Sequence, residues 1–159
     1  MRKIGDILKA VYRKDYGALG ATTREELNGT DADGRTPLMH AVLEGDPDLV
    51  RFLIDRGVDV NAADHGQKWT ALHFAARDQN TPVVRLLLDA GAAVDPDDAF
   101  GNTPLWRSVM QADLNLETVR ELLRHGADVR KKNNYGEAPV DVARKRGRKD
   151  LMNVLEKTN

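Results

Sequence analysis

The chain has 159 residues, of which 41% are apolar and 31% charged, a balance typical of a globular or repeat domain and not of a membrane-embedded or disordered chain. Lysine and arginine number 24 against 25 aspartates and glutamates, so the net charge of -1 gives no overall attraction to nucleic acid or anionic lipid. The absence of cysteine excludes disulfides, thiolate catalysis and cysteine metal ligands.

The first thirty residues contain two short helical patterns. Residues 7–11 form an apolar cluster, and residues 23–27 form a second short segment in which Thr23 and Glu26 stand at the spacing of a capping box. Charges interrupt residues 1–9, so this start is not a secretory signal peptide. No stretch approaches the ~20 apolar residues of a membrane helix, and we expect a cytoplasmic location without membrane attachment.

From residue 31 onward the chain repeats itself. Related tripeptides recur at steps of 34, 33 and 35 residues, namely Thr36-Pro37-Leu38, Thr70-Ala71-Leu72, Thr103-Pro104-Leu105 and Ala138-Pro139-Val140. Threonine followed by proline is typical of a helix start, because the hydroxyl accepts a free backbone N–H and proline fits the first helical position. Each tripeptide therefore predicts the start of a first helix.

A second apolar cluster follows each of these starts. Its residues recur at spacings of three and four, which places them on one helix face, in residues 49–54, 83–88, 119–123 and 151–155. A glycine stands three residues after the end of each of the first three clusters, where it can adopt the left-handed conformation that ends many helices: Gly57, Gly91 and Gly126. Each unit is thus predicted as helix, short loop, helix and extended connection.

These residues resemble the ankyrin-repeat family, whose units carry D-x-x-G-x-T-P-L-H-x-A-A before the second helix and L-L-x-x-G-A-D-V-N after it. The resemblance covers residues 31–159, and residues 31–62 and 70–76 match it most closely. It implies an all-α solenoid, here a small stand-alone domain of a kind expected in bacteria. The expected organisation is a degenerate capping repeat, three full repeats and a C-terminal capping repeat, at residues 1–30, 31–63, 64–97, 98–132 and 133–159.

Two segments depart from the family pattern. Residues 64–69 displace the turn glycine, and residues 111–116 carry two extra residues between the helices. We expect irregular loop geometry at both.

No residue set supports catalysis or metal binding. The four histidines, at 40, 65, 73 and 125, lack zinc-site spacing, and the single serine, Ser108, has no nucleophile-elbow setting. The glycines stand singly and form no phosphate-binding loop. The resemblance gives His73 a structural role in bonding the backbone of the neighbouring repeat. We therefore expect no enzyme, no cofactor, no metal and no small-molecule substrate.

Charge is distributed unevenly along the chain. Residues 31–98 hold 13 acidic and 6 basic residues, a balance of -7, whereas residues 99–159 hold 8 acidic and 12 basic residues, a balance of +4. The basic segments 130–132 and 144–149 are interpreted as a solvated cap, which we favour over a dedicated site for an acidic partner. Nucleic acid is a weaker hypothesis, because the other end of the array is acidic.

The resemblance also implies where a partner would bind. Ankyrin hairpin tips and first helices line a concave surface, and the family's exposed variable positions give these partner-binding candidates: Arg35, Leu43, Glu44, Trp69, Arg77, Asp78, Phe100, Asn102, Trp106, Met110, Tyr135 and Lys145. The aromatic residues of successive hairpins, Trp69, Phe100 and Tyr135, are expected to form an exposed binding stripe, with packing between hairpins as the alternative. Trp106 replaces the family's histidine and fits packing and binding equally.

The expected function is therefore non-catalytic protein binding by a chain that is monomeric when free. An alternative is an immunity or antitoxin protein that covers the active site of a toxic enzyme. An enzyme on a repeat scaffold and a passive structural spacer are the competing hypotheses. The spacer predicts no unusual exposure of aromatic residues on the concave side.

Overall fold

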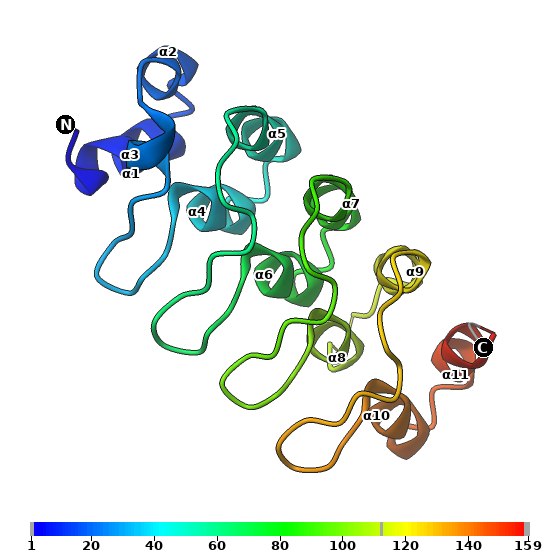
Figure 1. The fold of residues 1–159 in the computed structure, drawn as a ribbon. Coiled ribbons are helices and arrows are strands. Elements are labelled where there is room, and N and C mark those ends of the chain that lie inside the picture. Colours follow the sequence, from blue (N-terminus) through cyan, green and yellow to red (C-terminus); the bar gives the residue numbers. More distant parts are fainter. Residues whose placement is uncertain (1, 112, 158–159) are drawn as a thin grey trace.

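The computed structural model describes residues 2–111 and 113–157 (Figure 1). In that part of the chain it contains eleven helices and no strand, with one isolated antiparallel bridge between Ala63 and Thr70. The helices are α1 (Ile4–Tyr12), α2 (Tyr16–Gly20), α3 (Arg24–Leu27), α4 (Pro37–Leu43), α5 (Pro47–Asp55), α6 (Ala71–Arg77), α7 (Thr81–Asp89), α8 (Pro104–Val109), α9 (Leu116–Arg124), α10 (Pro139–Lys145) and α11 (Lys149–Glu156).

The helices stack in two rows. One row holds the first helices of the units, α1, α4, α6, α8 and α10, and the other holds α2, α5, α7, α9 and α11 (Figure 1). The long connections between units project from the first row on the side away from the second row (Figure 1). The predicted all-α solenoid is confirmed, while the unit boundaries given above stay a prediction.

Local chemistry starts the helices as predicted. The Thr36 and Thr103 hydroxyls accept hydrogen bonds from the backbone N–H groups of Met39 and Trp106, at 3.3 and 3.2 Å. Proline occupies the first turn of α4, α8 and α10. The capping box at α3 is also present, because Thr23 and Glu26 each accept a hydrogen bond from the other's backbone N–H. Each of these bonds satisfies a backbone donor that the helix itself leaves free.

The N-terminal cap is built differently from our expectation. Its second-row helix is α2, which lies between the two helical patterns predicted at residues 7–11 and 23–27. Lys14 ends α1 by adopting a positive φ of 53°, and the Asp15 carboxylate then caps α2 by accepting from the Ala18 N–H at 2.8 Å. The segment at residues 24–27 forms the additional short helix α3.

A single apolar core runs through the stack. Leu38, Leu72 and Leu105, in the first turns of α4, α6 and α8, are all buried. The second row contributes a matching buried leucine from each of α5, α7, α9 and α11: Leu53, Leu87, Leu122 and Leu155. The helices in the middle of the stack therefore bury one face against the preceding unit and another against the next, as expected of a stacked repeat.

Both irregular segments have a physical explanation. Lys68 adopts a φ of 56° where Gly34, Gly101 and Gly136 provide the positive φ in the other units, because residues 64–70 contain one extra residue. The longer segment at residues 111–116 is tied to the previous unit by the Gln79 side chain, which accepts from the Asn115 N–H at 2.8 Å. Residue 112 of that segment lies outside the described residues.

Candidate functional site

The tips of the projecting connections are held by one acidic or amide side chain each. Asp31 accepts from the N–H groups of Asp33 and Arg35, both at 2.9 Å. Asp64, Asp98 and Asn133 each accept two backbone N–H groups in the same way. These bonds fix four hairpin-like tips without a sheet.

Neighbouring tips are also bonded to each other. The N–H of each following tip donates to a carbonyl of the one before: His65 to Asp33 at 2.8 Å, Ala99 to Gln67 at 2.8 Å, and Asn134 to Phe100 at 3.0 Å. The tips and the first-row helices thus form one ordered surface, which we call the hairpin face. Side chains on this face have fixed spacings set by the stack.

Two aromatic side chains of the hairpin face are exposed, as expected. Phe100 and Tyr135 have exposed fractions of 42% and 72%. Both stand two residues after the side chain that holds their tip, and the Asn134–Phe100 bond joins the two tips. Large apolar side chains are usually buried. Two exposed aromatic rings at fixed positions on adjacent tips are therefore unusual, because the core does not need either of them.

The expected exposure of Trp69 is wrong. Its exposed fraction is 7%, and its ring lies against Phe74 at a centroid distance of 5.0 Å. The guanidinium groups of Arg77 and Arg107 lie 5.2 and 4.8 Å from the ring centroid. Trp69 lies two residues before α6, and side chains of that helix and of α8 cover it. It packs the hairpin against the helices, so the exposed stripe contains two aromatic residues and not three.

Asn102 is likewise buried, with an exposed fraction of 3%, so the exposure expected of it is wrong. Its side-chain carbonyl accepts from the Asn133 amide at 2.8 Å, and its backbone carbonyl accepts from the His73 ring at 3.0 Å. Asn102 therefore links three consecutive units instead of facing solvent.

A hollow of about 440 Å³ brings together three of the candidates, Arg35, Trp69 and Arg77. It lies between the first two tips and α6. Phe74 forms part of its wall, with the guanidinium groups of Arg35 and Arg77 at 5.6 and 5.5 Å from its ring centroid. The sequence placed these three residues on one surface but gave no sign that they share a cavity.

The remaining candidates lie at the ends of the first-row helices. Leu43 and Glu44 are exposed at the end of α4, and Arg77 is paired with Asp78 at 2.6 Å at the end of α6. Lys145 is exposed at the end of α10 and paired with Glu137. Met110 is half-buried, and its sulfur lies 3.7 Å from the Arg146 guanidinium. These side chains border the hairpin face but do not converge on one point.

The sequence left open whether Trp106 packs against the core or binds a partner, and its position in the structure fits both roles. It is half-buried and packs against the core, while the Arg107 guanidinium lies 5.5 Å from its ring centroid. Its indole N–H is shielded from solvent without a hydrogen-bond partner among the described residues.

Sequence reasoning missed the ion pair that supports this face. Arg107 donates two hydrogen bonds to the fully buried Asp98 carboxylate, one of them at 2.8 Å, while its guanidinium also covers Trp69. Burial alone would raise the pKa of Asp98, but hydrogen bonds from the Asn102 N–H, from Arg107 and from the Phe100 N–H hold it below its ordinary value. The two residues lie nine positions apart in different elements, so no local pattern pairs them.

The histidines do not form a site. His73 is fully buried and donates to the Asn102 carbonyl, which agrees with the bridging role that the resemblance implies. His40 bonds Tyr12 at 2.7 Å and Asp31 at 2.8 Å, which ties α1 to the first full unit. His65 and His125 are exposed in separate units. Among the described residues, no three histidine or acidic side chains are grouped so as to hold a metal ion.

Burial lowers the pKa of the His73 imidazole below its ordinary value. The unfolded chain therefore binds a proton here more readily than the folded chain, and stability is complete above the unfolded pKa of about 6.5 and declines as the pH falls below it. We expect the free energy of unfolding to fall between about pH 7 and pH 5, by up to about 1.4 kcal/mol per pH unit.

Urea titrations at several pH values would measure this slope. The control is His73→Gln, whose side chain does not titrate in this range and should remove this part of the pH dependence. Equal slopes for the two proteins would contradict the assignment to His73.

The basic residues near the C-terminus largely pair with acids of their own unit. Arg144 lies 3.2 Å from Asp141, and Arg148 lies 2.8 Å from Asp150. These pairs support a solvated cap as the interpretation of residues 144–149.

None of the helices in the described part of the chain is both long and apolar enough to cross a bilayer.

Known proteins match the chain over its repeats. It is 40% identical over 100 residues to serine/threonine-protein kinase 12 of Arabidopsis thaliana, covering 63% of this chain and 21% of the kinase. It is 36% identical over 103 residues to a putative ankyrin repeat protein of Rickettsia bellii, covering 62% and 56% of the two chains. It is 30% identical over 168 residues to human NF-kappa-B inhibitor zeta, covering 86% and 23%. The chain thus spans from 21% to 56% of the length of these three relatives.

A family model described as ankyrin repeats (3 copies) matches residues 6–98 and 62–133. Ankyrin repeats are generic protein-interaction modules and are generally non-catalytic. The matched residues include helices α2 to α9 and the tips held by Asp31, Asp64 and Asp98. On this evidence the chain belongs to the ankyrin-repeat family.

Proposed function

We propose that this chain is a non-catalytic binding module that captures one protein partner on its hairpin face. The observation that carries the proposal is the exposure of Phe100 and Tyr135 on two adjacent tips whose backbones are bonded to each other. A rigid surface loses little conformational entropy when it binds, and aromatic side chains dominate the energetics of many interfaces. Cytoplasmic location and a monomeric free state belong to the same proposal.

The neighbouring candidates extend this surface. Arg35 and Arg77 line the hollow beside it, and Leu43, Glu44, Asp78, Met110 and Lys145 border it along the helix ends. Trp69 and Asn102 are buried beneath this surface and support it. Trp106 is half-buried, so its position fits both support and contact with the partner. We expect the partner to contact the exposed residues and to depend on the buried ones only through folding.

Phe100→Ala and Tyr135→Ala are expected to leave folding intact and to weaken partner binding, with at least one costing about 2 kcal/mol or more in binding free energy. Both side chains are exposed, so their loss opens no cavity. The partner would be isolated by affinity capture from the native host and identified by mass spectrometry, and its affinity for each variant measured by calorimetry.

Arg51→Ala, on the opposite row of helices, is the control and should bind like the wild type. Unchanged affinity in both aromatic variants would overturn the proposal. If the captured partner is an enzyme that loses its activity when bound, the chain acts as an immunity protein, which is the alternative function within the class of binding proteins. Trp69→Ala, in contrast, should lower the melting temperature because that ring is packed.

A further inference from the structure

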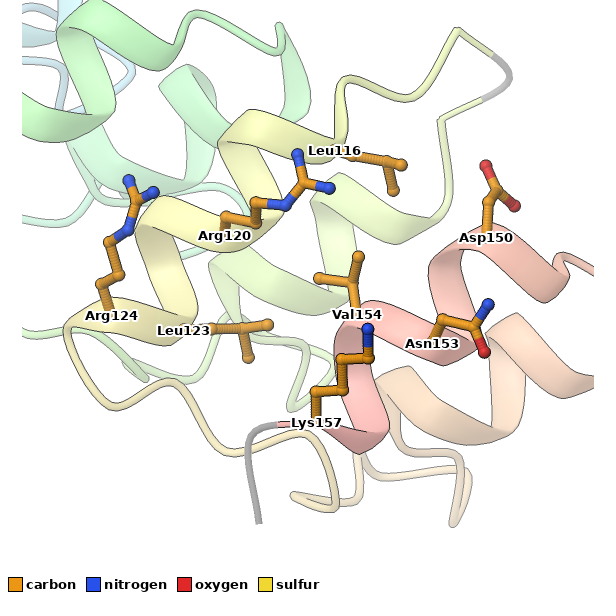
Figure 2. Close-up of a pocket in the computed structure, with 8 residues that line it drawn as sticks. All are labelled: Leu116, Arg120, Leu123, Arg124, Asp150, Asn153, Val154 and Lys157. Carbon is orange, nitrogen blue, oxygen red and sulfur yellow. The ribbon is translucent and has the colours of Figure 1, made fainter.

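A groove of about 550 Å³ lies on the second row of helices, between α9 and α11 and apart from the hairpin face. Figure 2 shows Leu123 of α9 and Val154 of α11 extending into the space between the two helices. Leu116 joins them, so the floor of the groove is apolar. The rim carries the cations Arg120, Arg124 and Lys157 (Figure 2).

The preceding pair of second-row helices closes the same space with polar contacts. Arg85 of α7 donates to Glu121 of α9 at 3.0 Å, and the hydroxyls of Thr81 and Thr118 are 2.6 Å apart. These bonds join α7 to α9, and both threonines are buried.

Counted from the first residue of each helix, Arg120 holds the place of Arg85, and Val154 holds the place of Glu121. The acid that completes the α7–α9 contact is thus replaced by an apolar side chain between α9 and α11. Leu116 likewise stands where α7 has Thr81. The groove therefore has an apolar floor, and among the described residues the Arg120 guanidinium pairs with Glu117 of its own helix and not with a carboxylate of α11.

The charges around the groove leave an excess of cations. Arg85, Arg120 and Arg124 share the carboxylates of Glu117 and Glu121. Lys157 has no acidic partner among the described residues. The one acid on the rim, Asp150, is bound by Arg148 through two hydrogen bonds, which lower its pKa to about 2 and neutralise its charge locally.

We propose that this groove is a second docking site, and that its occupant is an acidic amphipathic helix of a partner protein. An apolar stripe on such a helix would cover Leu116, Leu123 and Val154. The carboxylates of the partner helix would pair with Arg120 and Lys157. The partner would then supply an acid to Arg120, as Glu121 supplies one to Arg85. The site does not depend on Phe100 or Tyr135.

The test uses the full chain and a fluorescent synthetic helix with leucines on one side and glutamates beside them. The peptide carries a covalent staple, because short isolated helices are marginal in water. Arg120→Glu is expected to weaken its binding by about tenfold or more, since a like charge would then face the peptide. Arg51→Glu is the matched control, because Arg51 holds the same place in α5 but lies outside the groove. It should bind within about twofold of the wild type.

Two further peptides test the chemistry of the site. Replacing the glutamates by lysines, or the leucines by serines, should abolish measurable binding. Equal weakening by Arg120→Glu and Arg51→Glu would show unspecific charge attraction and overturn the proposal, as would full binding of the serine peptide. Preferential binding of a single-stranded oligonucleotide, or a dimer of this chain that Arg120→Glu dissolves, would overturn it too.

Discussion

Replacing Leu87 by alanine is expected to lower the free energy of unfolding by about 2 to 5 kcal/mol. The side chain is fully buried in α7, which packs between α5 and α9 in the middle of the second row. Removing its methyl groups leaves a cavity that helices held on both sides cannot close. Leu53→Ala in α5 should have a similar effect, because Leu53 is also fully buried. Urea unfolding followed by circular dichroism would measure both.

The control is Arg51→Ala, on the exposed side of α5. It removes a larger side chain than either leucine but no buried surface, so its cost should fall within about 0.5 kcal/mol. Equal costs for all three variants would contradict the assigned helix register.

Features that depend on neighbouring residues could be predicted from the sequence. The N-caps at Thr36 and Thr103 and the capping box at Thr23 each involve residues within one helical turn. The buried leucines followed from spacings of three and four, because one helix face must be covered. The bridging role of His73 came from the family resemblance, since its partner, Asn102, lies in the next unit.

Features that depend on distant residues could not be predicted in this way. The burial of Trp69 is produced by Arg77 and Arg107, and the second of these belongs to the next unit. Its position before a helix looked like that of an exposed variable residue. The burial of Asn102 depends on Asn133 and His73, which come from the units on either side.

The groove between α9 and α11 could not be predicted from the sequence, because it also depends on residues of two different units. Its apolar floor includes Val154, which holds the place of Glu121, and each residue alone fits an amphipathic helix. Only the contact between Arg85 and Glu121 shows what that place does in the preceding unit. The exposure of Phe100 and Tyr135, in contrast, was predicted from their positions in the hairpins, and no described side chain of another unit covers them as Arg107 covers Trp69.

Removal of residues 133–159 is expected to destabilise the whole protein, with loss of helical signal or aggregation. This deletion takes away α10 and α11, which cover α8 and α9. The buried Leu105 and Leu122 lie on those two helices and would lose their neighbours on one side. In a short array the interfaces between units supply much of the stability, so the loss spreads beyond the exposed end.

Circular dichroism on heating and analytical ultracentrifugation would measure this effect. Removing residues 157–159 alone is the control, because it leaves all of α10 and α11 in place, and it should shift the melting temperature little. The difference between the two deletions isolates the contribution of the packed unit. A truncated protein that stays monomeric and melts at the same temperature as the full chain would show that α10 and α11 do not stabilise the helices they cover.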